Sequence, residues 1–138
     1  MVLTVSDGAI TRAEWGSGPQ DDSLLLRRAA QQMAEYFAGT RQNFELPLRV
    51  EASEFQQAVC DAMSAIPFGE TRTYGDIARD LGVPPQAIGQ ACGGNPIPVI
   101  IPCHRVLGAN GLGGFSGRGG VETKVWLLKH EGAAGLLI

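Results

Sequence analysis

Apolar and polar residues alternate over residues 2–16, on either side of the dipeptide Asp7-Gly8. A period of two is typical of strands, and an aspartate followed by a glycine suits a tight hairpin turn. The pattern therefore predicts two strands joined by a hairpin. Residues 44–50 carry a further apolar run, which predicts a strand leading out of this region.

Between these strands lies an apolar stripe with helical spacing. It predicts a helix that is capped by Asp22 or Ser23 and ends at Gly39. The residues expected to face the core are Leu26, Ala30, Met33 and Phe37. With the predicted strands, this helix makes a small N-terminal α/β domain over residues 1–50.

The remainder, residues 51–138, is predicted to form a second and mainly helical domain. Ser53 and Gln56 have the spacing of a capping box, and Pro67-Phe68-Gly69 ends the helix that they begin. The expected core face of this helix is Phe55, Val59, Ala62 and Ile66.

Two short helices follow, joined by a tight turn at Gly82-Val83-Pro84. Thr73 caps the first, which runs through Leu81, and Pro85 starts the second, which runs to about Cys92. The pair has the form of a helix-turn-helix, although an ordinary helical hairpin would give the same pattern. The second helix is small and uncharged, which favours a helix lying close along a groove over one that fills a core.

A last helix is predicted from Val121 to Glu131. Its expected core face is Val121, Val125 and Leu128, with Trp126 buried beside them. The helix dipole disfavours a carboxylate at the C-terminal end, so Glu131 is either solvated or paired with a compensating group.

The candidate chemistry lies between residues 95 and 116. Prolines at positions 96, 98 and 102 exclude a regular helix and stiffen the approach to Cys103, which is followed by His104 and then by a glycine-rich loop. A cysteine between apolar residues is commonly a small buried hydrophobe. The adjacent imidazole and guanidinium instead favour a reactive thiolate, because thiolate formation needs a nearby base or positive charge.

Composition narrows the class of protein. The chain has 138 residues, 44% of them hydrophobic and 18% charged, which is typical of a globular protein. Residues 1–10 lack the features of a signal peptide, and no apolar run is long enough for a membrane helix, so we expect a cytoplasmic protein without a membrane partner. The three cysteines, at positions 60, 92 and 103, have no paired spacing, which favours free thiols over disulfides or a metal site.

The formal net charge of -3 is unusual for a protein that contacts phosphates. The charge is unevenly distributed, however, because residues 84–120 contain no acidic side chain but include Arg105 and Arg118. The region of the candidate site is therefore expected to be locally positive. Such a protein would depend on backbone amides and helix N-termini for phosphate contacts.

Several motifs resemble one family in their order along the chain. They are Tyr36-Phe-Ala-Gly, Phe55-Gln-Gln-Ala-Val, Ile66-Pro-Phe-Gly-Glu-Thr-Arg-Thr-Tyr-Gly, Asn95-Pro, Ile101-Pro-Cys-His-Arg-Val, Gly114-Phe-Ser-Gly and Trp126-Leu-Leu-Lys-His-Glu-Gly. This set, which extends over nearly the whole chain, resembles the O6-alkylguanine-DNA alkyltransferases, also called methylated-DNA-protein-cysteine methyltransferases. The resemblance implies an α/β (α+β) fold whose helical C-terminal domain holds a winged helix-turn-helix-like DNA-binding unit. The family has one more strand at its start, so the N-terminal domain looks trimmed.

The resemblance also implies an activity: stoichiometric transfer of an alkyl group from O6-alkylguanine, with O4-alkylthymine as a second lesion, to Cys103. The thiol proton would pass through water to His104, which Glu131 orients, and Tyr74 would meet the charge on the leaving guanine. Asn95 would lock the turn that carries the cysteine. The implied substrate- and DNA-binding residues are Tyr74, Gln86, Ala87, Arg105, Val106 and Ser116. The implied partner is double-stranded DNA, bound by a monomer through the minor groove with the base flipped out and without a cofactor.

The sequence departs from the family pattern at three positions. Gln86 replaces an arginine that fills the space left by the flipped base, Cys60 replaces a common tryptophan, and Phe115 replaces a frequent tyrosine. One rival function is an alkyltransferase-like module that binds lesions without repairing them, but such modules have another residue at the position of Cys103. A thiol hydrolase or transferase for small molecules is a second rival, and it would require an oxyanion hole that the sequence does not reveal.

Overall fold

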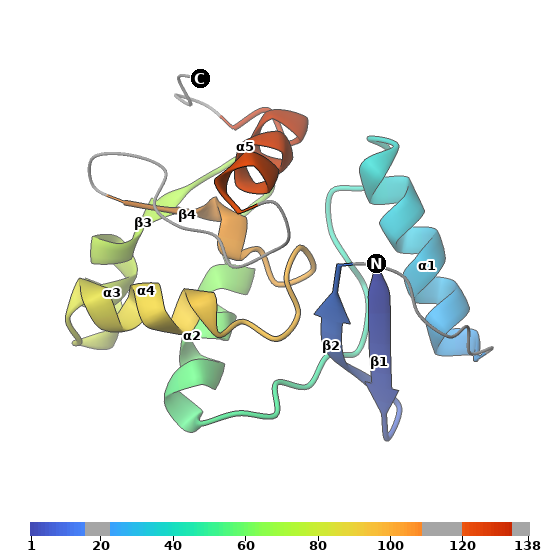
Figure 1. The fold of residues 1–138 in the computed structure, drawn as a ribbon, viewed down its shortest axis with the longest axis horizontal. Coiled ribbons are helices and arrows are strands. Elements are labelled where there is room, and N and C mark those ends of the chain that lie inside the picture. Colours follow the sequence, from blue (N-terminus) through green and yellow to red (C-terminus); the bar gives the residue numbers. More distant parts are fainter. Residues whose placement is uncertain (16–22, 109–119, 134–138) are drawn as a thin grey trace.

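The structure is a computed structural model, in which residues 1–15, 23–108 and 120–133 are described (Figure 1). It has an α+β fold with two small sheets. Strands β1 (Val2–Ser6) and β2 (Ala9–Glu14) form the predicted antiparallel hairpin. Asp7 and Gly8 both have positive φ angles, 48° and 77°, as a two-residue hairpin turn requires.

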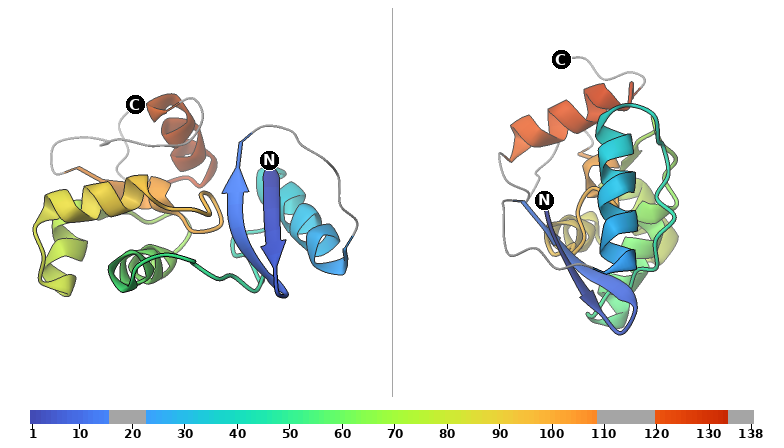
Figure 2. Two further views of the ribbon diagram at one scale, coloured as in Figure 1. Left: turned by 60° about the horizontal axis from the view of Figure 1, so that its bottom comes forward. Right: turned by 90° about the vertical axis from the view of Figure 1, so that its right-hand side faces the viewer.

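Helix α1 (Leu24–Phe37) begins at the predicted cap, Ser23, whose hydroxyl accepts a hydrogen bond from the amide of Leu26. It lies beside the hairpin on one side of the molecule, and helices α2 (Glu54–Ser64), α3 (Tyr74–Leu81) and α4 (Pro85–Gly93) lie on the other (Figures 1 and 2). Asp22 lies outside the described residues.

The predicted core face of α1 was partly right: Met33 is buried, but the buried face is rotated by about one position. Ala30 is exposed, and Phe37 keeps 36% of its surface exposed. The buried residues are Ala29, Gln32, Met33 and Tyr36. Polar groups explain the rotation: the Gln32 amide exchanges two hydrogen bonds with the backbone of Glu45, at 2.8 and 3.2 Å, and the Tyr36 hydroxyl has a buried acceptor.

The strand predicted over residues 44–50 is absent from the described structure, which has one isolated bridge there, between Leu48 and Ile10. The amide of Ile10 donates to the carbonyl of Pro47, and the amide of Arg49 donates back to Ile10. Pro47 has no amide hydrogen, so the ladder cannot continue through it.

Helix α2 (Glu54–Ser64) begins at Ser53, whose hydroxyl accepts from the amide of Gln56. The reciprocal half of the predicted capping box does not form, because the Gln56 side chain donates to the Ala91 carbonyl at 2.7 Å and so ties α2 to α4. The predicted core face was partly right: Val59 and Ile66 are buried and Phe55 is 38% exposed.

The two short helices are α3 (Tyr74–Leu81) and α4 (Pro85–Gly93), close to their predicted bounds. Thr73 and Asp76 form a complete capping box at the start of α3, and Gly82 ends it with a φ of 70°. The sequence did not reveal that β3 (Arg72–Thr73) pairs in parallel with β4 (Val106–Leu107), which places the start of α3 beside the chain that follows Cys103.

Helix α5 (Val121–His130) buries a different face from the one predicted. Trp126 is 50% exposed and Val121 is 45% exposed, so the predictions for both were wrong. The buried residues are Lys124, Leu127 and Leu128. Trp126 instead stacks on His130, one turn along, with ring centroids 4.9 Å apart.

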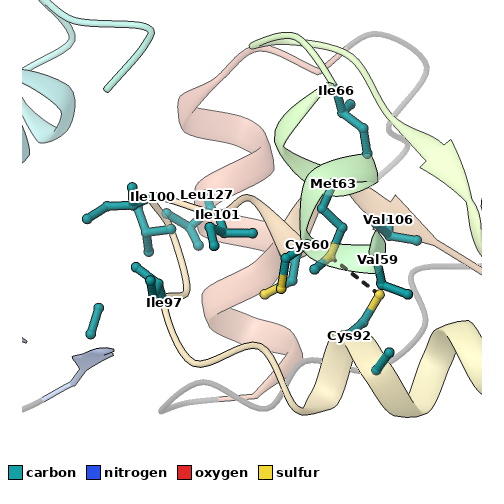
Figure 3. Close-up of a cluster of buried hydrophobic side chains, with 14 of the residues drawn as sticks. Val59, Cys60, Met63, Ile66, Cys92, Ile97, Ile100, Ile101, Val106 and Leu127 are labelled. Carbon is teal, nitrogen blue, oxygen red and sulfur yellow. Dashed lines mark hydrogen bonds between the residues drawn. The ribbon is translucent and has the colours of Figure 1, made fainter. Parts of the chain in front are cut away.

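One hydrophobic cluster runs through both halves of the chain, from Ile10 and Tyr36 to Leu127. Its centre is drawn in Figure 3, where α2 and α4 pack against the segment that leads to Cys103. The labelled residues are Val59, Cys60, Met63, Ile66, Cys92, Ile97, Ile100, Ile101, Val106 and Leu127. Among the described helices, none is long and apolar enough to cross a membrane.

The cap of α3 gives a test of the local structure. Thr73→Ala removes the hydroxyl that accepts from the Asp76 amide at 3.1 Å, and we expect it to lower the free energy of unfolding by about 1 kcal/mol. Thr73→Ser keeps the acceptor and is the matched control. Urea denaturation of the two variants measures the difference, and equal stability would show that the cap contributes nothing.

Candidate active site

The segment before Cys103 is held by the side chain of Asn95, which is 8% exposed. Its Nδ2 donates to the carbonyl of Ile101 at 2.8 Å, and its Oδ1 accepts from the amide of Ile97 at 3.0 Å. Both bonds are buried, so losing them would leave polar groups without partners. The side chain of Asn95 therefore holds the backbone of this segment in place.

Two tight turns set the direction of the backbone in the segment that Asn95 holds. Val99 has a φ of 73°, which is rare for a β-branched residue and costs on the order of 1–3 kcal/mol. The amide of Cys103 then donates to the carbonyl of Ile101 across Pro102, whose φ and ψ of -82° and 69° define an inverse γ-turn. A 3₁₀ turn, Cys103–Arg105, follows directly. The surrounding structure thus fixes the position of the cysteine.

Glu131, which caps the end of α5, is the centre of the polar cluster. Its carboxylate accepts hydrogen bonds from Tyr36 Oη at 2.6 Å, His104 Nε2 at 2.8 Å, and Arg105 Nε and Nη2 at 2.8 and 3.0 Å. Only 5% of the residue is exposed, so Glu131 is paired with compensating groups and is not solvated. Burial alone raises the pKa of Glu131, but the bonds from His104, Arg105 and Tyr36 lower it to about 2.

Arg105 is part of this cluster. It is 6% exposed, and its Nη1 donates to the carbonyl of Ile66 at 2.6 Å while the rest of the guanidinium contacts Glu131. We expected Arg105 to make the surface near the site positive, and this expectation was wrong, because the charge is buried and neutralised. Arg118 lies outside the described residues.

His104 is fully buried and has one ring nitrogen still available. Burial lowers the pKa of His104 and outweighs the opposite effect of Glu131, so the imidazole is neutral at neutral pH. The bond to Glu131 places the ring proton on Nε2. Nδ1 then carries a lone pair, and it has no hydrogen-bond partner among the described residues. A neutral imidazole held in this tautomer can accept a proton.

Cys103 itself is 5% exposed. Burial raises the pKa of its thiol, while hydrogen bonding with Asn95 and the charge of Lys124 act in the opposite direction. The ground state is therefore a thiol, and a thiolate has to form when the site is used.

The sequence analysis did not identify Lys124 as a residue of the site. A signal was available, because Lys124 lies three residues before Leu127 and so on the apolar face of the helix. It is fully buried, and its Nζ donates to the carbonyl of Val106 at 2.6 Å. The Nζ also lies 5.8 Å from the centroid of the Tyr74 ring. Burial lowers the pKa of Lys124 to about 8, against the raising effect of Cys103 and Cys92.

The structure brings most of the predicted catalytic residues into one region. Tyr74, at the start of α3, is half-buried and connects to it through Lys124. Gln86 is exposed and Ala87 half-buried at the start of α4, so neither belongs to the buried cluster. Ser116 and Phe115 lie outside the described residues.

The chain is similar to one group of known proteins. The family profile described as "6-O-methylguanine DNA methyltransferase, DNA binding domain" matches residues 54–133. The methylated-DNA–protein-cysteine methyltransferase of Methanosarcina acetivorans is 48% identical over 116 residues, which are 82% of this chain and 73% of the relative. The constitutive methylated-DNA–protein-cysteine methyltransferase of Bacillus subtilis is 47% identical over 109 residues, 77% of this chain and 66% of the relative.

Solved structures agree with the sequence matches. The crystal structure of Mycobacterium tuberculosis OGT in complex with DNA superposes with a TM-score of 0.82 at 38% identity, over 94% of this chain and 84% of that one. The likeness therefore includes the N-terminal strands and helix as well as the part matched by the family profile.

The buried charge of Lys124 predicts a change in thiol reactivity. Lys124→Met removes a cation that lowers the pKa of Cys103 and so favours the thiolate, and we expect iodoacetamide to modify Cys103 roughly tenfold more slowly at pH 7. The defect should shrink above pH 8, where wild-type Lys124 loses its charge. Peptide mass mapping separates Cys103 from Cys60 and Cys92.

Lys129→Met is the matched control, because Lys129 lies on the same helix and is exposed. Its rate should equal that of the wild type. If Lys124→Met is folded by circular dichroism and reacts at the wild-type rate, its charge does not act on Cys103.

Proposed function

Because the chain belongs to the 6-O-methylguanine DNA methyltransferase family, it repairs DNA by transferring a methyl group to a cysteine of its own, and we propose that Cys103 is this cysteine. The observation that carries the proposal is that buried Cys103 directly precedes His104 in one turn, and that the His104 imidazole is hydrogen-bonded to the buried carboxylate of Glu131. Neither Cys60 nor Cys92 is followed by a histidine in the sequence. A module that binds lesions without transfer is not favoured, since the curated relatives are named as methyltransferases.

The proposed reaction is a displacement at carbon. The proton of the Cys103 thiol passes through a bridging water to Nδ1 of His104, while Nε2 remains bound to Glu131. The sulfur attacks the methyl carbon of O6-methylguanine, so that a carbon–sulfur bond forms and the bond from carbon to O6 breaks. Tyr74 supplies a hydrogen bond or proton to the departing guanine. Guanine is restored in the DNA.

The product on the protein is a thioether. No group among the described residues is arranged to cleave it, so we propose that each chain acts once. The requirements are a single thiol, a proton acceptor and a hydrogen-bond donor to the leaving group, all of which are side chains, and the proposal includes no cofactor.

DNA is the partner, and we propose that it is duplex DNA carrying alkylated guanine, bound by a monomer through the minor groove. Helix α4 supports this because none of its exposed residues, Pro85, Gln86, Gln90 and Gly93, is charged or bulky and apolar, which suits a narrow groove. The base would flip out into the site, with Gln86 entering the stack and Ala87 against the groove wall. The flipped base would be contacted by the backbone carbonyl of Val106 and by Ser116.

We also propose that the chain forms two domains, residues 1–50 and residues 51–138.

Transfer to Cys103 can be tested by mass. After incubation with duplex DNA that contains one O6-methylguanine, we expect the intact protein to gain one methyl group, mapped to Cys103. Cys103→Ala should bind the same duplex but gain no mass, and Cys60→Ala, which alters another buried thiol, should be methylated as the wild type is. Unchanged mass of the wild-type protein after prolonged incubation would refute the proposal.

The glutamine at position 86 predicts that the protein repairs lesions in duplex DNA slowly relative to its reaction with the free alkylated base. A residue that fills the gap left by a flipped base offsets part of a cost of a few kcal/mol. Arginine can do so with a charge-assisted hydrogen bond worth roughly 1.5–3 kcal/mol, against about 0.5–1.5 for a neutral one, and it also attracts phosphates. We therefore expect Gln86→Arg to speed repair of duplex lesions about tenfold or more and to leave the reaction with free O6-methylguanine unchanged.

Gln90→Arg is the control for charge alone, because Gln90 is exposed on the same helix one turn further on. Single-turnover rates on duplex and on free base distinguish the two effects. If Gln86→Arg gains no more than Gln90→Arg, Gln86 is not the residue that enters the stack.

A further inference from the structure

We propose that Tyr36, in helix α1 of the N-terminal half, is a positioning residue for methyl transfer, acting through Glu131 on His104. The proposal rests on the proposed function, in which His104 takes the proton of Cys103. It gives the N-terminal half a specific part in the reaction, a part that none of the sequence motifs assigned to it.

The phenol shares an oxygen with the histidine. Tyr36 Oη donates to Glu131 Oε2 at 2.6 Å, and His104 Nε2 contacts the same oxygen at 2.8 Å. Arg105 Nη2 reaches this oxygen too, at 3.0 Å. Three donors therefore compete for the charge of one buried carboxylate oxygen, and a change in any of them alters the other two.

Packing fixes the phenol in place. Tyr36 is fully buried, and its ring lies 5.1–6.3 Å, centroid to centroid, from four other rings. These rings belong to Phe37, Phe44, Phe68 and His130. His130 also binds the backbone carbonyl of Tyr36 through Nε2 at 2.6 Å. The ring is thus anchored independently of its hydroxyl, and Tyr36→Phe would remove the donor with the packing intact.

The hydroxyl acts only as a donor. Burial, followed by the hydrogen bond to Glu131 and its negative charge, raises the pKa of Tyr36 far above its ordinary value, so the phenol stays protonated at every pH at which the protein works. It therefore always withdraws charge from Oε2. Without it, the carboxylate would hold the His104 proton more tightly and would stabilise the imidazolium.

The direction of the pH effect follows from this. His104 must be neutral to accept the thiol proton, so the transfer rate falls as the pH drops through the pKa of His104. A stronger carboxylate raises this pKa and moves the acid limb of the rate profile to higher pH. The charged and titratable groups around His104 are Glu131 and Lys124 from α5, Arg105 and Cys103 from its own turn, and Tyr36 from α1.

The experiment compares Tyr36→Phe with Phe37→Leu, which removes a ring that packs on Tyr36 but does not touch Glu131. The rate of Cys103 modification is measured between pH 5 and 8, with iodoacetamide and with DNA containing O6-methylguanine. We expect Tyr36→Phe to move the acid limb upward by about one pH unit or less and Phe37→Leu to leave it unchanged. Nuclear magnetic resonance of the ¹⁵N-labelled imidazole of His104 should show the same shift.

A graded substitution keeps the test decisive if Tyr36→Phe folds poorly. Site-specific 3-fluorotyrosine at position 36 is a stronger donor of nearly the same shape, and it should move the acid limb downward. Wild-type profiles in both variants would overturn the proposal, as would an equal shift in Phe37→Leu, which would indicate general loosening. The iodoacetamide and resonance measurements use no DNA, so a failure of the proposed function would appear separately, as a wild-type protein that gains no methyl group.

Discussion

The arrangement of the site depends on one buried carboxylate. Glu131 ends a helix, where the dipole disfavours negative charge, and it is almost completely removed from water. A charge in this position is tolerable only when it is fully paired, and removing one partner of such a group typically costs several kcal/mol. The partners come from two separate elements, α1 and the turn that carries Cys103, so the requirement to satisfy Glu131 brings both of them together with the end of α5.

How far the sequence predicted the structure depends on the range of the interactions involved. The hairpin turn at Asp7-Gly8 and the caps at Ser23 and Thr73 need only neighbours within a few residues, and they form as expected. The buried face of α1 was wrong because Tyr36 turns toward an acceptor 95 residues further along the chain. Lys124 escaped notice for the same reason: its acceptor, the carbonyl of Val106, precedes its helix by a whole loop.

For the candidate site, too, the success of the prediction depended on the range of the interactions. The resemblance to known motifs indicated which residues would carry the chemistry and that Asn95 would hold the turn, and local pattern indicated a reactive thiol at Cys103. Neither could reveal that Arg105 faces inward. A charged side chain is expected at the surface unless it has a buried partner, and only the structure shows that Glu131 is this partner. Among the described residues, the site therefore has less exposed positive charge than the sequence suggested, which supports the proposal that DNA is contacted mainly through groove shape and backbone amides.

The stacking of Trp126 on His130 has a practical consequence. The indole is half exposed, lies 5.8 Å from the ring of Phe37, and rests on the imidazole that also holds the backbone of Tyr36. Trp126 is thus an intrinsic optical reporter at the junction of α1 and α5. In a chain whose other tryptophan, Trp15, is replaced, its fluorescence can follow the separation of these helices in real time without an added label.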